Sequence, residues 1–290
     1  MTTIALLGIG LMGFPMGQRL CAAGHAVRAW NRTPDKARRL EPSGATVHSQ
    51  PEVAVHGADV VITMLESGDV VEHVLFEQGT AAAIAPGSLV IDMSSIAPAQ
   101  ARDHAKRLSA LGINYLDAPV SGGTLGAEAG TLAIMVGGDA VALQRAESVL
   151  KVFGRATHVG PTGAGQLAKL ANQMIVGITI GAVAEALLLC EKGGADMTKV
   201  KEAITGGFAD SRILQVHGQR MVERDFAPRG RMSVQLKDLR NALATAHEIG
   251  FDAPITALFE QLYAKGIEHG LADLDHSGLF VELAQRNGMR

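Results

Sequence analysis

The sequence has few cysteines, few aromatic side chains and no run of basic residues. Its two cysteines, Cys21 and Cys190, are far apart and form no CxxC pattern, which argues against a disulfide framework or a zinc site. Aromatic residues make up 4% of the chain and the net charge is -3, so the composition gives no support to nucleic-acid binding. The ten histidines form no HxH or HExxH pattern, and we expect no metal site.

The N-terminus also lacks the basic start, long apolar region and cleavage site of a signal peptide, and we expect a cytoplasmic protein. The longest apolar stretch, Met174 to Cys190, has the length of a membrane span. Glu185 lies within it and its flanks are only weakly basic, which favours a buried helix over a span. We therefore expect neither a membrane nor a nucleic acid as a partner.

What the sequence has is length, glycine and apolar residues in alternating patterns. The 290 residues are 47% hydrophobic and include 34 glycines, enough for about two domains. Short apolar runs alternate with helical patterns over roughly the first 160 residues, which predicts a parallel sheet with right-handed crossovers. The predicted strands are Ile4–Leu7, Ala26–Trp30, Val60–Met64, Leu89–Asp92, Ile113–Leu116 and Ala133–Val136, with helices such as Met12–Ala23 and Pro98–Leu111 between them.

After Pro161 the residue pattern becomes typical of helices. The predicted helices are Gly165–Gly193, Met197–Thr205, Ser211–Val222, Val234–Ile249 and Ile255–Gly270. The sequence therefore predicts an α/β protein with a Rossmann-type parallel sheet domain over residues 1–161, followed by an all-α domain over residues 162–290. The first of these helices is apolar nearly all round, so it must be covered on more than one side. This requirement predicts a homodimer or homotetramer.

A glycine motif directly follows the first predicted strand and opens a helix. It has the GxGxxG pattern of dinucleotide-binding loops, in which free N–H groups at the helix N-terminus attract phosphates. The alternative is a glycine-rich turn that only packs. The residues predicted to bind the cofactor here are Gly8, Gly10, Leu11, Met12 and Gly13.

The end of the second predicted strand indicates which dinucleotide binds. NAD-specific sites usually place a carboxylate there, whereas this chain has Asn31, Arg32 and Thr33. An arginine suits the 2′-phosphate of NADP. We expect NADP as the cofactor, with NAD as the alternative, although Arg32 can also be read as a solvated loop charge.

Two later segments carry polar groups suited to catalysis. Residues 117–123 (DAPVSGG) end a predicted strand at the carboxyl edge of the sheet, where a serine and two glycines suit the binding of a carboxylate; a structural turn is the alternative. Lys169 and Asn172 lie three residues apart, on one face of a predicted helix. The neighbours of Lys169 are apolar, and a lysine there is costly to bury unless it has a partner or a task.

With these motifs in place, the sequence resembles the β-hydroxyacid dehydrogenase family, whose members include 3-hydroxyisobutyrate dehydrogenase, tartronate semialdehyde reductase (2-hydroxy-3-oxopropionate reductase) and, more distantly, 6-phosphogluconate dehydrogenase. The resemblance covers essentially the whole chain. Residues 91–95 and 275–277 look most like the tartronate semialdehyde reductase branch. The motifs that carry the resemblance are GIGLMGFPMGQRL (8–20), DAPVSGG (117–123), GTLAIMVGG (130–138), GAGQLAKLANQ (163–173) and LKDL (236–239).

The resemblance implies a role for each matched position. Lys169 matches the catalytic lysine, and Asn172 the amide that orients the reacting oxygen, although in some relatives that amide falls where this chain has Gln173. Ser121, Gly122 and Gly123 match the substrate loop. The other matched positions are Met64, Leu65 and Ser94 on the cofactor side, and Lys237 near cofactor and substrate.

The resemblance implies an NAD(P)-dependent oxidoreductase that interconverts a short 3-hydroxy acid and its semialdehyde or ketone, with Lys169 as general acid and base. The alternatives are a dehydrogenase of a 3-hydroxy amino acid such as serine or threonine, and an imine reductase on the same fold. Phe208 and Ser211 are further candidates for the substrate pocket. The chain departs from the family at Glu66, where relatives often carry proline.

Overall fold

The computed structural model describes residues 2–289, and the chain divides into two compact units, Met1–Lys169 and Leu170–Arg290. The sequence predicts a boundary at Pro161. The two compact units join within helix α8 (Ala164–Lys192), whose first turn is hydrogen-bonded to the sheet unit.

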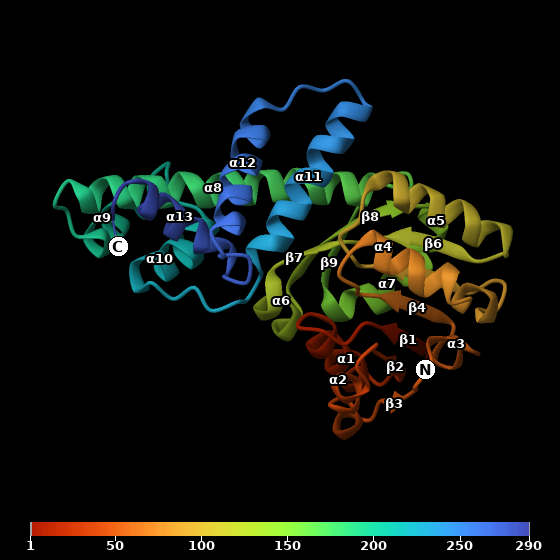
Figure 1. The fold of residues 1–290 in the computed structure, drawn as a ribbon. Coiled ribbons are helices and arrows are strands. Elements are labelled where there is room, and N and C mark those ends of the chain that lie inside the picture. The colour runs from red at the N-terminus through yellow and green to blue at the C-terminus, as the bar shows by residue number, and fades with distance from the viewer. Residues whose placement is uncertain (1, 290) are drawn as a thin grey trace. The chain divides into compact units, whose positions relative to one another are not determined.

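The first unit is built on one sheet whose strand order is β3-β2-β1-β4-β5-β6-β8-β7, with β9 paired to β8 (Figure 1). Pairing is parallel from β3 through β6. The strands are β1 (Thr3–Leu7), β2 (Ala26–Trp30), β3 (Thr46–Val47), β4 (Val60–Thr63), β5 (Leu89–Asp92), β6 (Asn114–Asp117), β7 (Val120–Ser121), β8 (Leu132–Gly138) and β9 (Gly154–Gly160).

The end of the sheet departs from the predicted parallel arrangement. Strand β8, which was predicted, runs antiparallel to β6, because the chain turns back through β7 and pairs β7 with β8. Strands β3, β7 and β9 were not predicted. The first two are only two residues long, and β9 is largely exposed and lacks an apolar run. The predicted class, a sheet domain followed by an all-α domain, is confirmed.

Both faces of the sheet are covered by helices. Alternate residues of β1 point to opposite faces: Ile4 and Leu6 pack in one apolar cluster with α1, whereas Ala5 and Leu7 pack in another with α3 and α5. Burial on both faces explains the continuous apolar runs in the sequence. The helices are α1 (Gly13–Ala22), α2 (Pro34–Arg38), α3 (Pro51–Val55), α4 (Gly68–Glu72), α5 (Pro98–Ala110), α6 (Gly123–Ala129) and α7 (Ala140–Phe153).

The second unit is helical and packs around the C-terminal part of α8. Ile180, Ala184 and Leu187 of α8 contribute to a core that also contains Tyr263 and Phe280. The predicted helix over 211–222 is a π-helical turn at Leu214–Gly218 followed by α10, and α13 was not predicted. The helices after α8 are α9 (Met197–Ile204), α10 (Gln219–Glu223), α11 (Met232–Glu248), α12 (Pro254–Glu268) and α13 (Leu279–Arg286).

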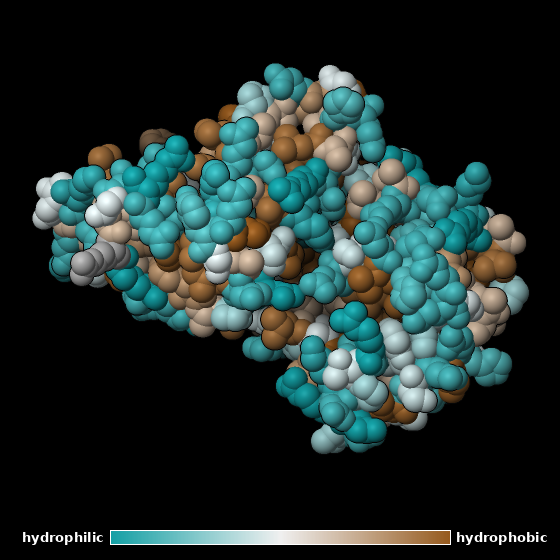
Figure 2. Space-filling view, in the orientation of Figure 1, coloured by the Kyte–Doolittle hydropathy of each residue, from teal (hydrophilic) through white to brown (hydrophobic). Residues whose placement is uncertain are grey.

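Helix α8 is only partly covered by its own chain. It is the one helix among the described residues with the length and apolar composition of a membrane span, a test that core helices of soluble proteins also pass. Only 39% of its most apolar window is buried, and Ile175 and Leu189 are 66% and 73% exposed. Figure 2 shows apolar side chains at the surface of the helical unit, among polar ones.

Candidate active site

The carboxyl ends of five parallel strands lie in register at one edge of the sheet. Leu7 pairs with both Trp30 and Thr63, Thr63 pairs with Asp92, and Asp92 pairs with Asp117. The segments that follow these residues therefore leave the sheet at the same edge. This is where open α/β sheets bind their ligands, and most of the predicted site residues follow one of these strands.

The glycine-rich loop after β1 has the backbone that its motif predicts. Gly8 has φ 107°, and a Cβ there would collide with the carbonyl of Met64. A Cβ on Gly13 would collide with the carbonyl of Gly8. At Gly10, by contrast, nothing lies within 4 Å of the Cβ position. Two glycines thus allow close packing and the third leaves open space over the N-terminus of α1, an arrangement that fits a dinucleotide pyrophosphate.

Asn31 holds this loop from the end of β2. Its Oδ1 accepts a hydrogen bond from the Ile9 N–H at 2.9 Å, and its Nδ2 donates to the Thr33 carbonyl at 3.0 Å. Arg32 and Thr33 are exposed. The side chain of Asn31 therefore orders the glycine loop, a role that its position in the sequence did not reveal.

Ser94, after β5, is fully buried and connects two strand ends. Its hydroxyl accepts a hydrogen bond from the Leu65 N–H at 3.0 Å, and its own N–H donates to Asp92 Oδ1 at 3.0 Å. Met64 and Leu65 are half-buried and Glu66 is exposed. The loops after β4 and β5 are thus fixed to each other on the side where the resemblance places the cofactor.

A buried polar group beneath these loops was missed by sequence reasoning. Asp92 Oδ1 accepts a hydrogen bond from the Thr63 hydroxyl at 2.7 Å, and Tyr115 donates to Oδ2 at 3.3 Å. Burial raises the pKa of Asp92, although hydrogen bonds from Thr63 and Ser94 oppose the shift. Apolar runs conceal such groups, because a single Asp at a strand end looks like the start of a loop.

The substrate loop predicted at 117–123 begins at the end of β6 and contains β7. Ser121 is half-buried and pairs with Ala133 of β8. Gly122 and Gly123 are exposed, with φ of 138° and 62°, so glycine suits both backbone conformations. The two glycines lead directly into α6.

Asp117 anchors the start of α8. Its Oδ1 accepts the Gly163 N–H at 2.8 Å and its Oδ2 accepts the Gln166 N–H at 2.9 Å. These N–H groups lie just before and within the first turn of the helix, where intrahelical acceptors are missing. Burial raises the pKa of Asp117 to about 6, although the two backbone hydrogen bonds oppose the shift.

Lys169 is buried, as the sequence predicted, with 9% of its surface exposed. It lies one turn beyond the anchored residues of α8. Gly165 allows the helix to come close to the sheet, because a Cβ there would collide with the carbonyl of Met135 and crowd that of Asp117. The predicted lysine is thus held on a helix start that is in direct contact with β6 and β8.

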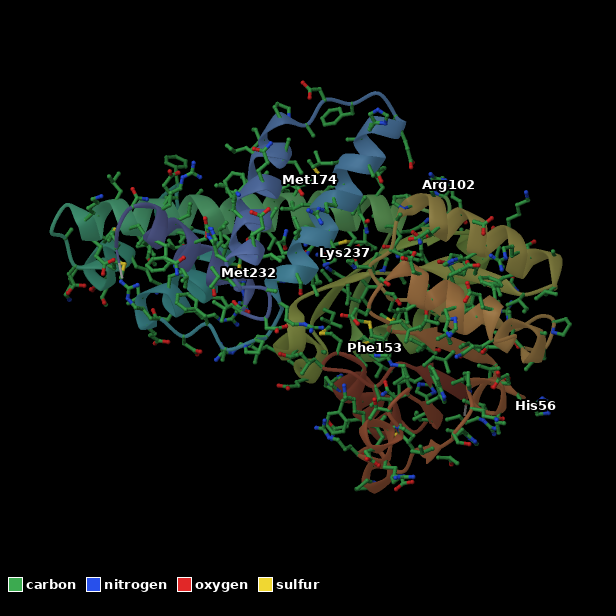
Figure 3. All side chains as sticks on the ribbon, viewed as in Figure 1. His56, Arg102, Phe153, Met174, Met232 and Lys237 are labelled. Atoms are coloured by element: carbon green, nitrogen blue, oxygen red, sulfur yellow. The ribbon has the colours of Figure 1, made fainter. Side chains whose placement is uncertain are left out.

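The remaining predicted site residues lie in the helical unit and form a network of their own. Asn172 Nδ2 donates to Gln173 Oε1 at 2.9 Å, and Gln173 Nε2 donates to Asp238 Oδ2 at 2.8 Å. Lys237, labelled on α11 in Figure 3, pairs with Asp238 at 3.2 Å. A further hydrogen bond at 2.9 Å joins the Gln235 amide to the Gln173 carbonyl.

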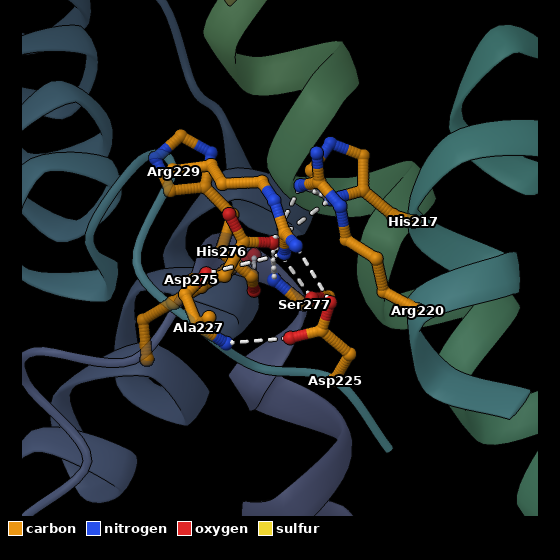
Figure 4. A network of polar contacts seen from close by, with 9 residues as sticks. His217, Arg220, Asp225, Ala227, Arg229, Asp275, His276 and Ser277 are labelled. Carbon is orange, nitrogen blue, oxygen red and sulfur yellow. Dashed lines mark hydrogen bonds and ion pairs between the residues drawn. The ribbon is translucent and has the colours of Figure 1, made fainter. Parts of the chain in front are cut away.

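A second polar cluster in the helical unit surrounds Asp275 (Figure 4). Its Oδ1 accepts hydrogen bonds from the Ser277 hydroxyl at 2.7 Å and from Arg220 at 2.9 Å, and His217 lies 3.3 Å away. Burial opposes the ionisation of Asp275, but these partners hold its pKa well below its usual range. The cluster joins α10 to the segment before α13. Of the two pocket candidates, Phe208 is fully exposed and Ser211 is half-buried.

Comparison with known proteins agrees with this architecture. Residues 3–161 match the NAD binding domain of 6-phosphogluconate dehydrogenase, and residues 163–283 match the NAD-binding domain of NADP-dependent 3-hydroxyisobutyrate dehydrogenase. The 2-hydroxy-3-oxopropionate reductase of Escherichia coli K12 is 41% identical over 282 residues, covering 97% of this chain and 96% of the relative. The NAD-dependent L-serine dehydrogenase of Pseudomonas aeruginosa is 36% identical and covers 96% of each chain.

Among solved structures, 3-hydroxyisobutyrate dehydrogenase of Mycobacterium tuberculosis, determined with L-serine, has a TM-score of 0.88 and 38% identity, covering 98% of this chain and 99% of that one. The sheet edge, its glycine loop and the helical unit define a dinucleotide-binding oxidoreductase. The chain belongs to the β-hydroxyacid dehydrogenase family. It is an NAD(P)-dependent hydroxyacid dehydrogenase.

Proposed function

We propose that the enzyme uses NADP to interconvert a short 3-hydroxy acid and its semialdehyde, of the kind handled by tartronate semialdehyde reductase or 3-hydroxyisobutyrate dehydrogenase. The observation that carries the proposal is the burial of Lys169 on a helix start anchored at the ligand-binding edge of the sheet. A buried lysine at such an edge is a candidate for proton transfer. The identity of the relatives supports the choice of substrate class.

The cofactor would lie along the carboxyl edge of the sheet. The loop from Gly8 to Gly13 would hold the pyrophosphate, and Arg32 at the end of β2 would bind a 2′-phosphate. Met64, Leu65 and Ser94 would border the nicotinamide side. When bound, the dinucleotide supplies or accepts the hydride.

The chain itself would bind the substrate and move the proton. Ser121 and the amides of Gly122 and Gly123 would hold the substrate carboxylate. The amine of Lys169 would protonate the carbonyl oxygen during reduction and remove the hydroxyl proton during oxidation.

Asn172 is the better candidate for orienting the reacting oxygen. The Gln173 side chain accepts from Asn172 and donates to Asp238 and Gln235. These contacts use both ends of the Gln173 amide, so it is less suited to orienting a substrate. Asn172 lies on α8 three residues after Lys169, and we propose that it directs the substrate oxygen toward the lysine. We also propose that Lys237, which pairs with Asp238, contributes to binding the cofactor and the substrate.

A 3-hydroxy amino acid is the second candidate substrate. A relative is named an L-serine dehydrogenase, and the Mycobacterium tuberculosis structure was determined with L-serine. An imine reductase on the same fold is less well supported, because Lys169 and the loop from Ser121 to Gly123 suit a carboxylate-bearing hydroxy compound.

We further propose a homodimer or homotetramer in the cytoplasm. The exposed apolar residues Ile175 and Leu189 on α8 suit burial against a second copy. Both cysteines are free, which suits a reducing compartment. The segment joining α11 to α12 and the start of α12 add further exposed apolar side chains: Ile249, Phe251, Ile255 and Leu258.

A substrate panel followed by nicotinamide absorbance tests the proposal. The panel includes 2-hydroxy-3-oxopropionate and the semialdehyde of 3-hydroxyisobutyrate for reduction, L-serine and L-threonine for oxidation, and a cyclic imine. We expect the highest kcat/KM for one of the two semialdehydes. A preference for L-serine would shift the assignment to the second candidate, and turnover of the imine alone would overturn both.

A further inference from the structure

Gln166, in the first turn of α8, is fully buried and uses both ends of its side-chain amide. Nε2 donates to the Ser94 carbonyl at 2.8 Å, and Oε1 accepts the Ile96 N–H at 3.0 Å. Reversing the amide would place NH₂ against an N–H and oxygen against a carbonyl, so the two partners fix its orientation. Neither an ionised glutamate nor a methionine, which have similar lengths, can satisfy both partners.

The segment to which the Gln166 side chain is hydrogen-bonded lies on the cofactor side of the site. Ser94 accepts a hydrogen bond from the Leu65 N–H through its hydroxyl and donates to Asp92 through its N–H. The loops after β4 and β5 are therefore one connected piece. The Gln166 amide attaches this piece to the helix that carries Lys169.

The backbone of Gln166 is fixed as firmly as its side chain. Its N–H donates to Asp117 Oδ2 at 2.9 Å, while the Gly163 N–H donates to Oδ1 of the same carboxyl at 2.8 Å. Lys169 follows three residues later, a rise of roughly 4.5 Å along the helix. The backbone position of the lysine is thus set by a residue held at both its backbone and its side chain.

We propose that Gln166 is a positioning residue: its amide sets the place of the Lys169 amine relative to the loops that border the cofactor. The inference rests on the proposed function, because it takes Lys169 as the proton-transferring group. Gln166 acts through the helix and touches neither substrate nor reacting atoms. A displacement of about 1 Å between reacting groups can cost on the order of 10²-fold in rate.

Two substitutions separate positioning from packing. Gln166→Met keeps the length and removes both hydrogen bonds, whereas Gln166→Glu, in its ionised form, keeps the acceptor for Ile96 and loses the donor to Ser94. Gln144→Glu, at an exposed position on α7, is the matched control. The measurements are steady-state kinetics with NADPH and its 4-deuterated form, cofactor titration by fluorescence, and thermal melting. Hydrogen exchange of residues 163–170 in the cofactor-free enzyme is measured alongside.

We expect turnover to fall roughly 10- to 100-fold in both Gln166 variants, with a larger primary isotope effect on kcat. The KM for substrate and the Kd for cofactor should change less than about threefold, because the groups that bind them stay in place. Hydrogen exchange in the first turn of α8 should be faster without cofactor. Gln144→Glu should match the parent in every measurement. If Gln166→Met does not fold, Gln166→Glu carries the test.

The failure of this inference can be told from that of the proposed function. Parent-like turnover in folded Gln166 variants, together with a large loss in Lys169→Ala, would overturn the positioning role and leave the lysine in place. Retained turnover in Lys169→Ala would remove Lys169 from the proposed mechanism, and with it the premise of this inference. Lower melting temperatures with unchanged kcat and isotope effect in the folded fraction would make Gln166 a packing residue only.

Discussion

Arg220 donates a hydrogen bond to Asp275 at 2.9 Å, and the side chain of Asp275 is 1% exposed. Removing one partner of a buried pair leaves the other charge uncompensated. We expect Asp275→Ala to lower the free energy of unfolding by about 3 kcal/mol, measured by urea denaturation at pH 7. Asp273→Ala, at a position 87% exposed beside Arg231, should change it by less than about 0.5 kcal/mol. Equal losses of unfolding free energy in the two variants would show that burial of the Arg220–Asp275 pair does not add to stability.

Titration of Asp117 should make the free energy of unfolding decrease as the pH rises. Its pKa is about 6 in the folded chain and about 3.9 when unfolded, so the folded state binds its proton more tightly. The stabilising effect of that proton is full below about pH 4 and is lost as the pH rises through 6. Relative to Asp117→Asn, the parent should lose about 2 kcal/mol of unfolding free energy between about pH 4.5 and 7.5. Parallel pH curves for the two proteins would contradict this.

Replacing Lys169 should separate chemistry from cofactor binding. Lys169→Ala removes the proposed proton donor and leaves the loop from Gly8 to Gly13 intact. We expect a loss of at least about 10²-fold in kcat and a nearly normal Kd for NADP in a fluorescence titration. Lys169→Arg should also be poor, because a guanidinium does not release its proton near neutral pH. Near-normal turnover in Lys169→Ala would move the proton-transfer role toward Lys237.

Cofactor preference should depend on Arg32. The residue is exposed after β2, where no carboxylate is available to bind a ribose hydroxyl. We expect the parent to prefer NADP, and Arg32→Ala to raise the Kd for NADP roughly 10-fold or more while changing that for NAD less than threefold. Titrations of both cofactors with both proteins measure this. Equal catalytic efficiency with NAD and NADP in the parent would count against it.

The exposed apolar residues of α8, such as Ile175 and Leu189, should determine the oligomeric state. Light scattering is expected to show a dimer or tetramer, and Ile175→Glu should shift it toward smaller species, because a charge would have to be buried. Val141→Glu is the control: Val141 is 65% exposed, close to the 66% of Ile175, but lies on α7 of the sheet unit. An active parent monomer at low concentration would refute the prediction.

Local patterns were enough to predict much of the sheet unit. The apolar runs at β1, β2, β4 and β5 identified strands buried on both faces, and the glycine spacing after β1 indicated the tight loop found there. The apolar neighbours of Lys169 predicted its burial. Each of these signals is contained within about a dozen residues, where periodicity and turn chemistry are informative.

Roles that depend on distant contacts were not predictable. Asp117 meets Gly163 across 46 residues, and Gln166 meets Ile96 across 70. No local pattern marks either partner. The short strands β3 and β7 have too few residues to show alternation, and β9 is exposed. The all-round apolar pattern of α8 indicated that its own chain would not cover it fully, but it did not indicate which residues, such as Ile175 and Leu189, stay exposed.

The anchored first turn of α8 also limits which changes of chain length the protein can accept. An α-helix turns by about 100° for each residue. One residue inserted between Gln166 and Lys169 would therefore swing the lysine away from the direction in which the sheet edge now holds it, even if every hydrogen bond of Gln166 survived. Exposed polar turns such as the one at Gly193 and Gly194, after α8, can lengthen freely. Over evolutionary time, insertions should accumulate at such turns and be purged from the four residues that begin with Gln166.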